Sequence, residues 1–85
     1  GKEMYIGRYY LKQSAFLAAI NRFRFVVTEY QNTSHTPEAL HRIVEAYISL
    51  GLINEAQATA AVLGYNFPES DWYKSTYDLI NNFLQ

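Results

Sequence analysis

The chain has no cysteine, which excludes disulfide bonds, thiolate metal ligands and a cysteine nucleophile. It also has no apolar run near the roughly 20 residues that a membrane-spanning helix needs, and no signal-peptide pattern. Basic residues are few, and the sequence pI near 6.1 lacks the footprint of a nucleic-acid-binding domain. These absences favour a small globular domain whose partner is not a nucleic acid.

The chain is rich in apolar and aromatic residues. Its 85 residues are 49% hydrophobic, with eight Tyr and five Phe, so it should fold rather than stay disordered. This length suits one domain, residues 1–85, with a modest core.

Charge is unevenly distributed although the net charge is only −1. Residues 1–30 hold five Lys or Arg against two Glu, and residues 31–85 hold two against six Asp or Glu. The basic first part could favour an acidic partner surface. Two solvated faces of different sign explain the pattern equally well.

The most informative feature is an internal repeat with a spacing of 37 residues. It resembles the tetratricopeptide signature, whose usual period is about 34 residues, with the extra residues in the polar stretch 31–37. Such repeats form stacks of helical hairpins that bind other proteins. The corresponding positions are Ile6 and Ile43, Gly7 and Val44, Tyr10 and Tyr47, Ala19 and Ala56, and Phe23 and Ala60.

The repeat predicts an all-α fold of about five antiparallel helices in a right-handed superhelical stack. Residues 2–36 and 37–69 would be two repeats, and residues 70–85 a C-terminal capping helix. The expected helices cover 2–13, 16–30, about 37–50, the region after Asn54, and the region after Ser70.

Single residues predict the helix ends and contacts. Thr36, Asn54 and Ser70 are candidate N-caps, and a turn is expected at 14–15. Gly51 should end the third helix, and Gly64 with Pro68 the fourth. Gly7 indicates close helix packing. The predicted apolar stripes are Phe16, Ile20, Phe23, Val27 and Tyr30 on the second helix, and Tyr73, Tyr77, Ile80 and Leu84 on the fifth.

Several short strings are more specific than the repeat. They are the residues of 9–12 (YYLK), 18–23 (AAINRF), 37–40 (PEAL), 45–47 (EAY) and 60–68 (AAVLGYNFP). Together they resemble the C-terminal repeats of the BamD (ComL-like) lipoproteins, with an alphaproteobacterial character. The resemblance covers Glu3 to about Leu79.

The resemblance implies a non-enzymatic scaffold of the β-barrel assembly machinery at the periplasmic face of the outer membrane. Such proteins dock on the POTRA domains of BamA, alongside the other assembly lipoproteins, and unfolded outer-membrane proteins are a further partner left open. The chain resembles a fragment without the lipidated cysteine that anchors the family. The family's BamA contact would be carried by Asn21 and Arg22, whose alternative is a solvated helix face.

The first helix of each repeat should line a concave groove. Its expected residues are Met4, Arg8, Lys12, His41, Glu45 and Ile48. The 37-residue alignment also predicts two cross-helix pairs, Arg8 with Glu45 and His41 with Asp78.

Other functions have weaker support. His35, Glu38 and His41 do not converge as metal ligands or as an acid–base site, so no cofactor, metal or catalytic residue is expected. A tetratricopeptide adaptor or co-chaperone is the alternative function, but the groove lacks the Lys and Asn cluster that clamps a peptide carboxylate. Met4, Tyr5, Tyr9 and Phe16 are expected to be exposed at a cut end of the stack, where the fragment would self-associate.

Overall fold

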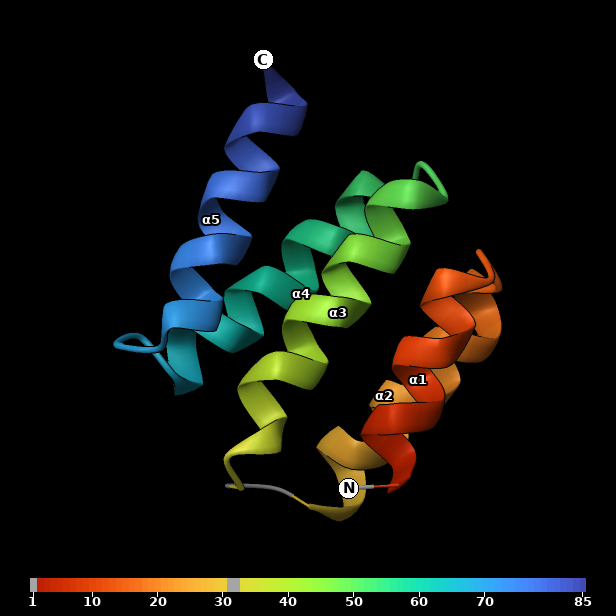
Figure 1. Cartoon of the computed structure of the whole chain (residues 1–85). Coiled ribbons are helices and arrows are strands. Elements are labelled where there is room, and N and C mark those ends of the chain that lie inside the picture. Colours follow the sequence, from red (N-terminus) through yellow and green to blue (C-terminus); the bar gives the residue numbers. More distant parts are fainter. Residues whose placement is uncertain (1, 31–32) are drawn as a thin grey trace.

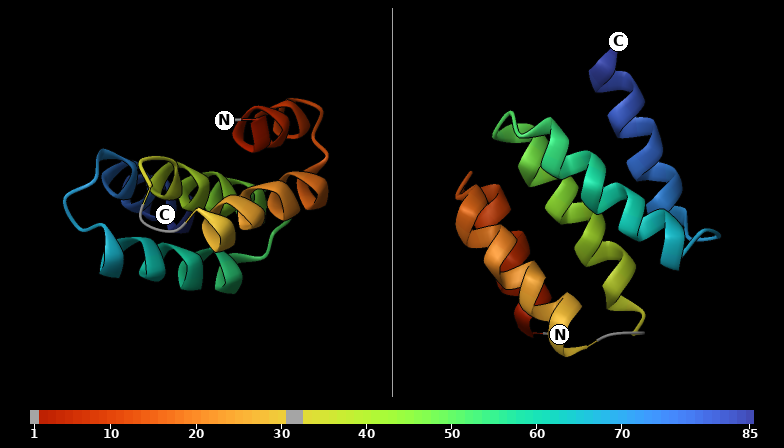
Figure 2. Two further views of the ribbon diagram at one scale, coloured as in Figure 1. Left: turned by 90° about the horizontal axis from the view of Figure 1, so that it is seen from below. Right: turned by 180° about the vertical axis from the view of Figure 1, so that it is seen from behind.

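The computed structural model describes residues 2–30 and 33–85, in which α-helix is the regular secondary structure. The five helices are α1 (Lys2–Lys12), α2 (Phe16–Glu29), α3 (His35–Ser49), α4 (Ile53–Asn66) and α5 (Asp71–Leu84). Helices α1, α3 and α5 lie in one layer and α2 and α4 in the other (Figures 1 and 2). The predicted all-α class is confirmed. None of the described helices is long and apolar enough to cross a membrane.

Three predicted helix boundaries follow from local chemistry. The Ser70 hydroxyl accepts a hydrogen bond from the backbone N–H of Trp72 at 3.1 Å and caps α5. Gly51 has φ of 77° just after α3, a conformation that costs glycine little. Ser14 has φ of 58° in the turn after α1, which confirms the predicted turn at 14–15.

Three other boundary predictions are wrong. Thr36 lies inside α3, and its hydroxyl donates to the Tyr30 carbonyl at 2.9 Å instead of capping a helix. Asn54 lies inside α4, which begins at Ile53 without a side-chain cap. Gly64 also lies inside α4, and a Cβ there would approach the Tyr73 ring to 2.6 Å. The glycine therefore admits a ring from α5 rather than ending the helix.

The core lies where the two layers meet, and Gly7 and Phe23 are in close contact there. Phe23 is fully buried, and a Cβ on Gly7 would lie 2.7 Å from two atoms of its ring. The predicted close contact of α1 and α2 at Gly7 is therefore confirmed. The other hydrophobic core residues are Met4, Ala19, Ile20, Val26, Ala39, Ile43, Val44, Ala46, Tyr47, Ala56, Ala60 and Ile80.

Parts of both predicted apolar stripes differ from the structure. On α2, Val26 is buried whereas Tyr30 is exposed, because α2 ends at Glu29. On α5, Thr76 and Ile80 are buried whereas Tyr77 and Leu84 are exposed. The buried face of α5 is therefore rotated toward a polar residue, whose hydroxyl is hydrogen-bonded inside the protein.

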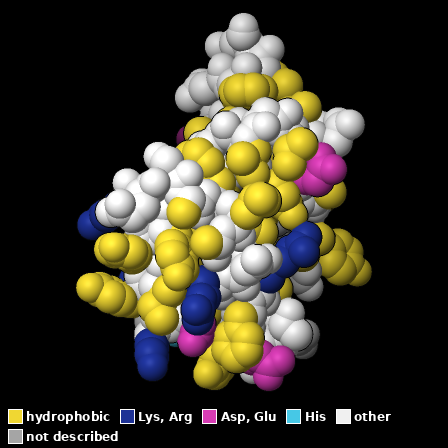
Figure 3. All heavy atoms as spheres, turned by 90° about the vertical axis from the view of Figure 1, so that its right-hand side faces the viewer, with side chains coloured by type: hydrophobic (Ala, Val, Ile, Leu, Met, Phe, Trp, Pro, Cys, Tyr) yellow, Lys and Arg dark blue, Asp and Glu magenta, His cyan; other side chains and the backbone are white. Residues whose placement is uncertain are grey.

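The outer face of the first hairpin carries several apolar side chains among basic ones (Figure 3). Tyr5 and Tyr9 are exposed as predicted, at 69% and 53%. Phe16 is only partly exposed, and Met4 is 1% exposed because it packs into the core. Self-association through this hairpin stays a prediction that would rest on the two tyrosines.

Candidate partner-binding surfaces

Asn21 and Arg22 lie in the middle of α2, on its outer side. Asn21 is exposed and the Arg22 side chain is 43% exposed. One guanidinium nitrogen of Arg22 donates to the Glu3 carboxylate at 3.2 Å, which ties α2 to α1. Since a guanidinium has five N–H donors, Arg22 keeps donors available for a partner carboxylate.

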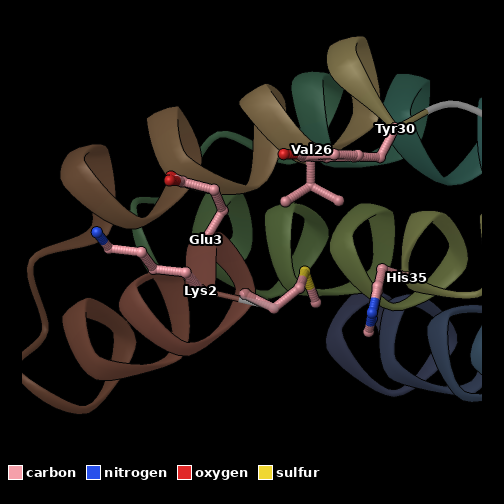
Figure 4. Close-up of a pocket in the computed structure, with 6 residues that line it drawn as sticks. Lys2, Glu3, Val26, Tyr30 and His35 are labelled. Atoms are coloured by element: carbon pink, nitrogen blue, oxygen red, sulfur yellow. The ribbon is translucent and has the colours of Figure 1, made fainter.

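A mainly apolar pocket of about 310 Å³ lies beside this ion pair. Lys2 and Glu3 come from α1, Val26 from α2, Tyr30 from the position just after α2, and His35 from the start of α3 (Figure 4), with Met4 completing the wall. A side chain of a partner bound near Arg22 would find this pocket within the same hairpin.

The expected concave residues divide into two groups. Arg8, Lys12 and Glu45 border a hollow of about 370 Å³ between α1 and α3, together with Leu11, Phe16, Arg42 and Ser49. Ile48 is partly buried, whereas Met4 and His41 are buried. The open part of the wall is therefore mostly charged.

A branched ion-pair network crosses this wall. Arg8 on α1 donates to both carboxylate oxygens of Glu38 on α3, at 2.7 and 2.9 Å. Arg42 donates to Glu38 at 3.3 Å and to Glu45 at 3.0 Å. Both arginines are thus neutralised within the protein, so this wall is poorly suited to clamp a peptide carboxylate through them.

The predicted pair of Arg8 with Glu45 is wrong. Glu38 and Glu45 are seven residues apart on α3, so they share a face about 10 Å apart along the axis. Arg8 reaches the nearer carboxylate, and Arg42, between the two, pairs with both. The repeat period predicted the correct face of α3, but not the position along the helix axis at which Arg8 finds its partner.

The predicted pair of His41 with Asp78 is also wrong. The His41 Nδ1 atom lies 2.6 Å from the buried Thr76 hydroxyl, and its Nε2 atom lies 3.5 Å from Glu45. Asp78 is exposed, because residues two apart on a helix point about 200° away from each other. The Trp72 ring completes the His41 environment at 5.2 Å between centroids and also lies under Arg42, at 5.1 Å.

The network shifts the pKa values of Arg8, Glu38 and Glu45. The hydrogen bonds from Arg8 lower the pKa of Glu38, against an opposing effect of burial. Burial raises the pKa of Glu45, but hydrogen bonds from His41 and Arg42 outweigh it and leave that pKa lowered. The hydrogen bond to Glu38 raises the pKa of Arg8. Both carboxylates, Glu38 and Glu45, are therefore charged near neutral pH.

We expect Glu38→Gln to lower the free energy of unfolding by about 1–2 kcal/mol at pH 7, which lies between the contributions of exposed and buried ion pairs. An intermediate value is expected because the Arg8 side chain is 41% exposed. A lowered folded pKa stabilises the protein above the unfolded value of about 4.3. This contribution is lost as pH falls through the folded pKa. The wild type and Glu38→Gln should therefore converge in urea denaturation at acid pH.

Glu69→Gln is the matched control, because Glu69 is an exposed carboxylate in the turn before α5. It should change stability by no more than a few tenths of a kcal/mol at any pH. An equally small effect of Glu38→Gln at pH 7 would show that the Arg8 pair contributes no stability.

Three residues were not predicted from the sequence: Glu38 and Arg42 of the network, and Thr76, the partner of His41. A signal existed for two of them, because Arg42 follows Glu38 by four residues and precedes Glu45 by three, spacings that allow ion pairs on a helix. No comparable signal marks Thr76, whose partner lies 35 residues away. Residues 2–30 and 33–85 also contain no group of three or more acidic or histidine side chains arranged to hold a metal ion.

Comparison with known proteins gives a consistent match. Residues 1–63 match the family model YfiO, described as outer membrane lipoprotein. The chain is 58% identical to the outer membrane protein assembly factor BamD of Caulobacter vibrioides, over 96% of this chain and 27% of that protein. It is 54% identical to the BamD of Rickettsia prowazekii, over 98% of this chain and 33% of that protein. The BamD of a Neisseria meningitidis strain is 43% identical over 82% of the chain.

Proposed function

This chain belongs to the YfiO family of outer membrane lipoproteins, and from this premise we propose that it is a non-enzymatic scaffold of the β-barrel assembly machinery. The observation that carries the proposal is the 54–58% identity, over nearly the whole chain, to two proteins named outer membrane protein assembly factors. The chain spans only 27% and 33% of those relatives. Its proposed role is therefore that of one segment: to hold a partner of the machinery at the outer membrane.

The proposed partner is the POTRA region of BamA, and the proposed contact is the outer side of α2 at Asn21 and Arg22. Two features support it. Arg22 is half-exposed and bound to Glu3 through one nitrogen, and the adjacent pocket offers apolar walls. A planar guanidinium can bind a partner carboxylate through two parallel hydrogen bonds. Other assembly lipoproteins and unfolded outer-membrane proteins are further proposed partners.

We expect Arg22→Glu to weaken binding to BamA POTRA domains from the same source by about tenfold or more, because it sets like charge against an acidic partner. Isothermal titration calorimetry would measure the affinity. Circular dichroism should show unchanged helix content and a nearly unchanged melting midpoint. Equal affinity of Arg22→Glu and the wild type would remove Arg22 from the interface.

Two control variants separate this contact from general charge effects. Lys74→Glu makes the same charge change at an exposed position of α5 and should bind like the wild type. Glu3→Gln removes the internal partner of Arg22 and should leave POTRA affinity unchanged or raised. Weakening by Lys74→Glu as strong as that by Arg22→Glu would indicate long-range electrostatics instead of a contact.

A further inference from the structure

A second hollow, of about 410 Å³, lies between α2 and α4 on the other layer of the stack. Helices α2 and α4 flank this hollow, with α3 behind and between them (Figure 2, right). The lining residues are Arg24, Val27 and Thr28 from α2, Leu40 and Ile43 from α3, and Thr59 and Val62 from α4. We call this the α2–α4 groove.

The groove is apolar at its floor and on one wall. Leu40 and Ile43 on α3 are buried beneath it, at 5% and 3% exposure, whereas Val62 on α4 is 47% exposed. The Thr59 hydroxyl donates to the Glu55 carbonyl at 3.0 Å, so its donor is already used. An aliphatic side chain could therefore enter the groove without leaving the Thr59 hydroxyl donor buried and unpaired.

The Arg24 side chain lies at the edge of the groove and is held there by a hydrogen bond. One nitrogen of the Arg24 guanidinium donates to the Tyr47 hydroxyl at 2.8 Å, and Tyr47 is itself buried. Among residues 2–30 and 33–85, no carboxylate pairs with Arg24. The other arginines of the chain, Arg8, Arg22 and Arg42, all pair with glutamates. Arg24 is therefore held in place with donors left over.

Arg24 and Arg22 lie on different faces of α2. Two residues apart on α2, their side chains point about 200° away from each other around the axis. Arg22 bonds to α1 and Arg24 to α3. A partner bound at Arg22 would therefore leave the α2–α4 groove open.

We propose that the α2–α4 groove is a second docking site, for a partner segment in which an aliphatic side chain neighbours a carboxylate. The aliphatic side chain fills the hollow above Leu40 and Ile43, and the carboxylate binds the free donors of Arg24. Arginine is one of the residue types at which binding energy concentrates in protein interfaces. The site does not depend on the docking proposed at Arg22, because the two faces share no lining residue.

The test uses two blocked heptapeptides, Ser-Gly-Leu-Glu-Leu-Gly-Ser and the same peptide with Gln in place of Glu. Each is titrated to millimolar concentration into the isotope-labelled chain and followed by NMR. The Glu peptide should shift the Val62 methyl and Arg24 Nε signals and bind about tenfold more tightly than the Gln peptide. Shifts that are absent, or that avoid the α2–α4 groove, would overturn the site. Equal binding of the two peptides would overturn the role of Arg24.

Variants distinguish recognition from a structural role of Arg24. Arg24→Gln should lose the preference for the Glu peptide, whereas Arg24→Lys, which keeps the charge, should retain most of it. Val62→Asp, at an exposed position, should weaken binding of the Glu peptide while Arg22→Gln leaves it unchanged. A Val62 signal that moves with protein concentration alone would show that a second copy of the chain occupies the groove, and would overturn the proposed partner.

Discussion

Phe23→Ala should lower the free energy of unfolding by about 3–5 kcal/mol, the usual cost of truncating a buried Phe. Phe23 has no exposed surface, and its ring packs against the backbone of α1 at Gly7. The cavity cannot close easily, because a glycine offers no side chain to fill it. This is a large part of the stability of a small domain, since such domains have about 5–15 kcal/mol in total.

Urea denaturation followed by circular dichroism would measure the effect of Phe23→Ala. The control is Phe25→Ala two residues away, because Phe25 is 45% exposed and should cost much less. Similar losses for both variants would show that Phe23 does not carry the contact between α1 and α2.

Gly7→Val should also be strongly destabilising, for the opposite reason. A Cβ on Gly7 would lie 2.7 Å from the Phe23 ring, closer than atoms tolerate, and Val adds two further methyl groups. Overpacking of this kind costs about 1–3 kcal/mol and occasionally more. The gain in helix propensity from replacing a glycine, less than 1 kcal/mol for Val, does not offset it.

The double variant Gly7→Val with Phe23→Ala tests the cause. If the valine methyls occupy the space of the missing ring, the loss in the double variant should fall short of the sum of the single losses by more than about 0.5 kcal/mol. Additive losses would mean that the cost of Gly7→Val does not come from its contact with the Phe23 ring.

The sequence predicted well where one residue and its immediate neighbours decide the structure. The capping hydroxyl of Ser70 and the positive φ of Gly51 both follow from local chemistry. The contact at Gly7 was also predictable, because the repeat places a small residue where two helices meet. The N-cap prediction for Thr36 was wrong, because its hydroxyl donates a hydrogen bond to the Tyr30 carbonyl at the end of the preceding helix. This tertiary contact outweighs the N-cap preference of Thr36.

The charged wall was harder to predict, because a repeat aligns equivalent positions and not interacting ones. Arg8 is aligned with Glu45 but pairs with Glu38, two turns away on the same face of α3. His41 is aligned with Asp78 but bonds to Thr76. The tilt and relative height of neighbouring helices decide which side chains meet, and neither quantity is encoded in the period.

Two contacts between an aromatic ring and a glycine oppose the sliding of paired helices along each other. At Gly7 the Phe23 ring, and at Gly64 the Tyr73 ring, occupy the space of an absent Cβ. A shift of one helical turn, about 5.4 Å, would bring each ring against a neighbouring residue that has a side chain. Within α1–α2 and α4–α5, these contacts therefore oppose shear motion, so a bound partner would move each helix pair as one unit.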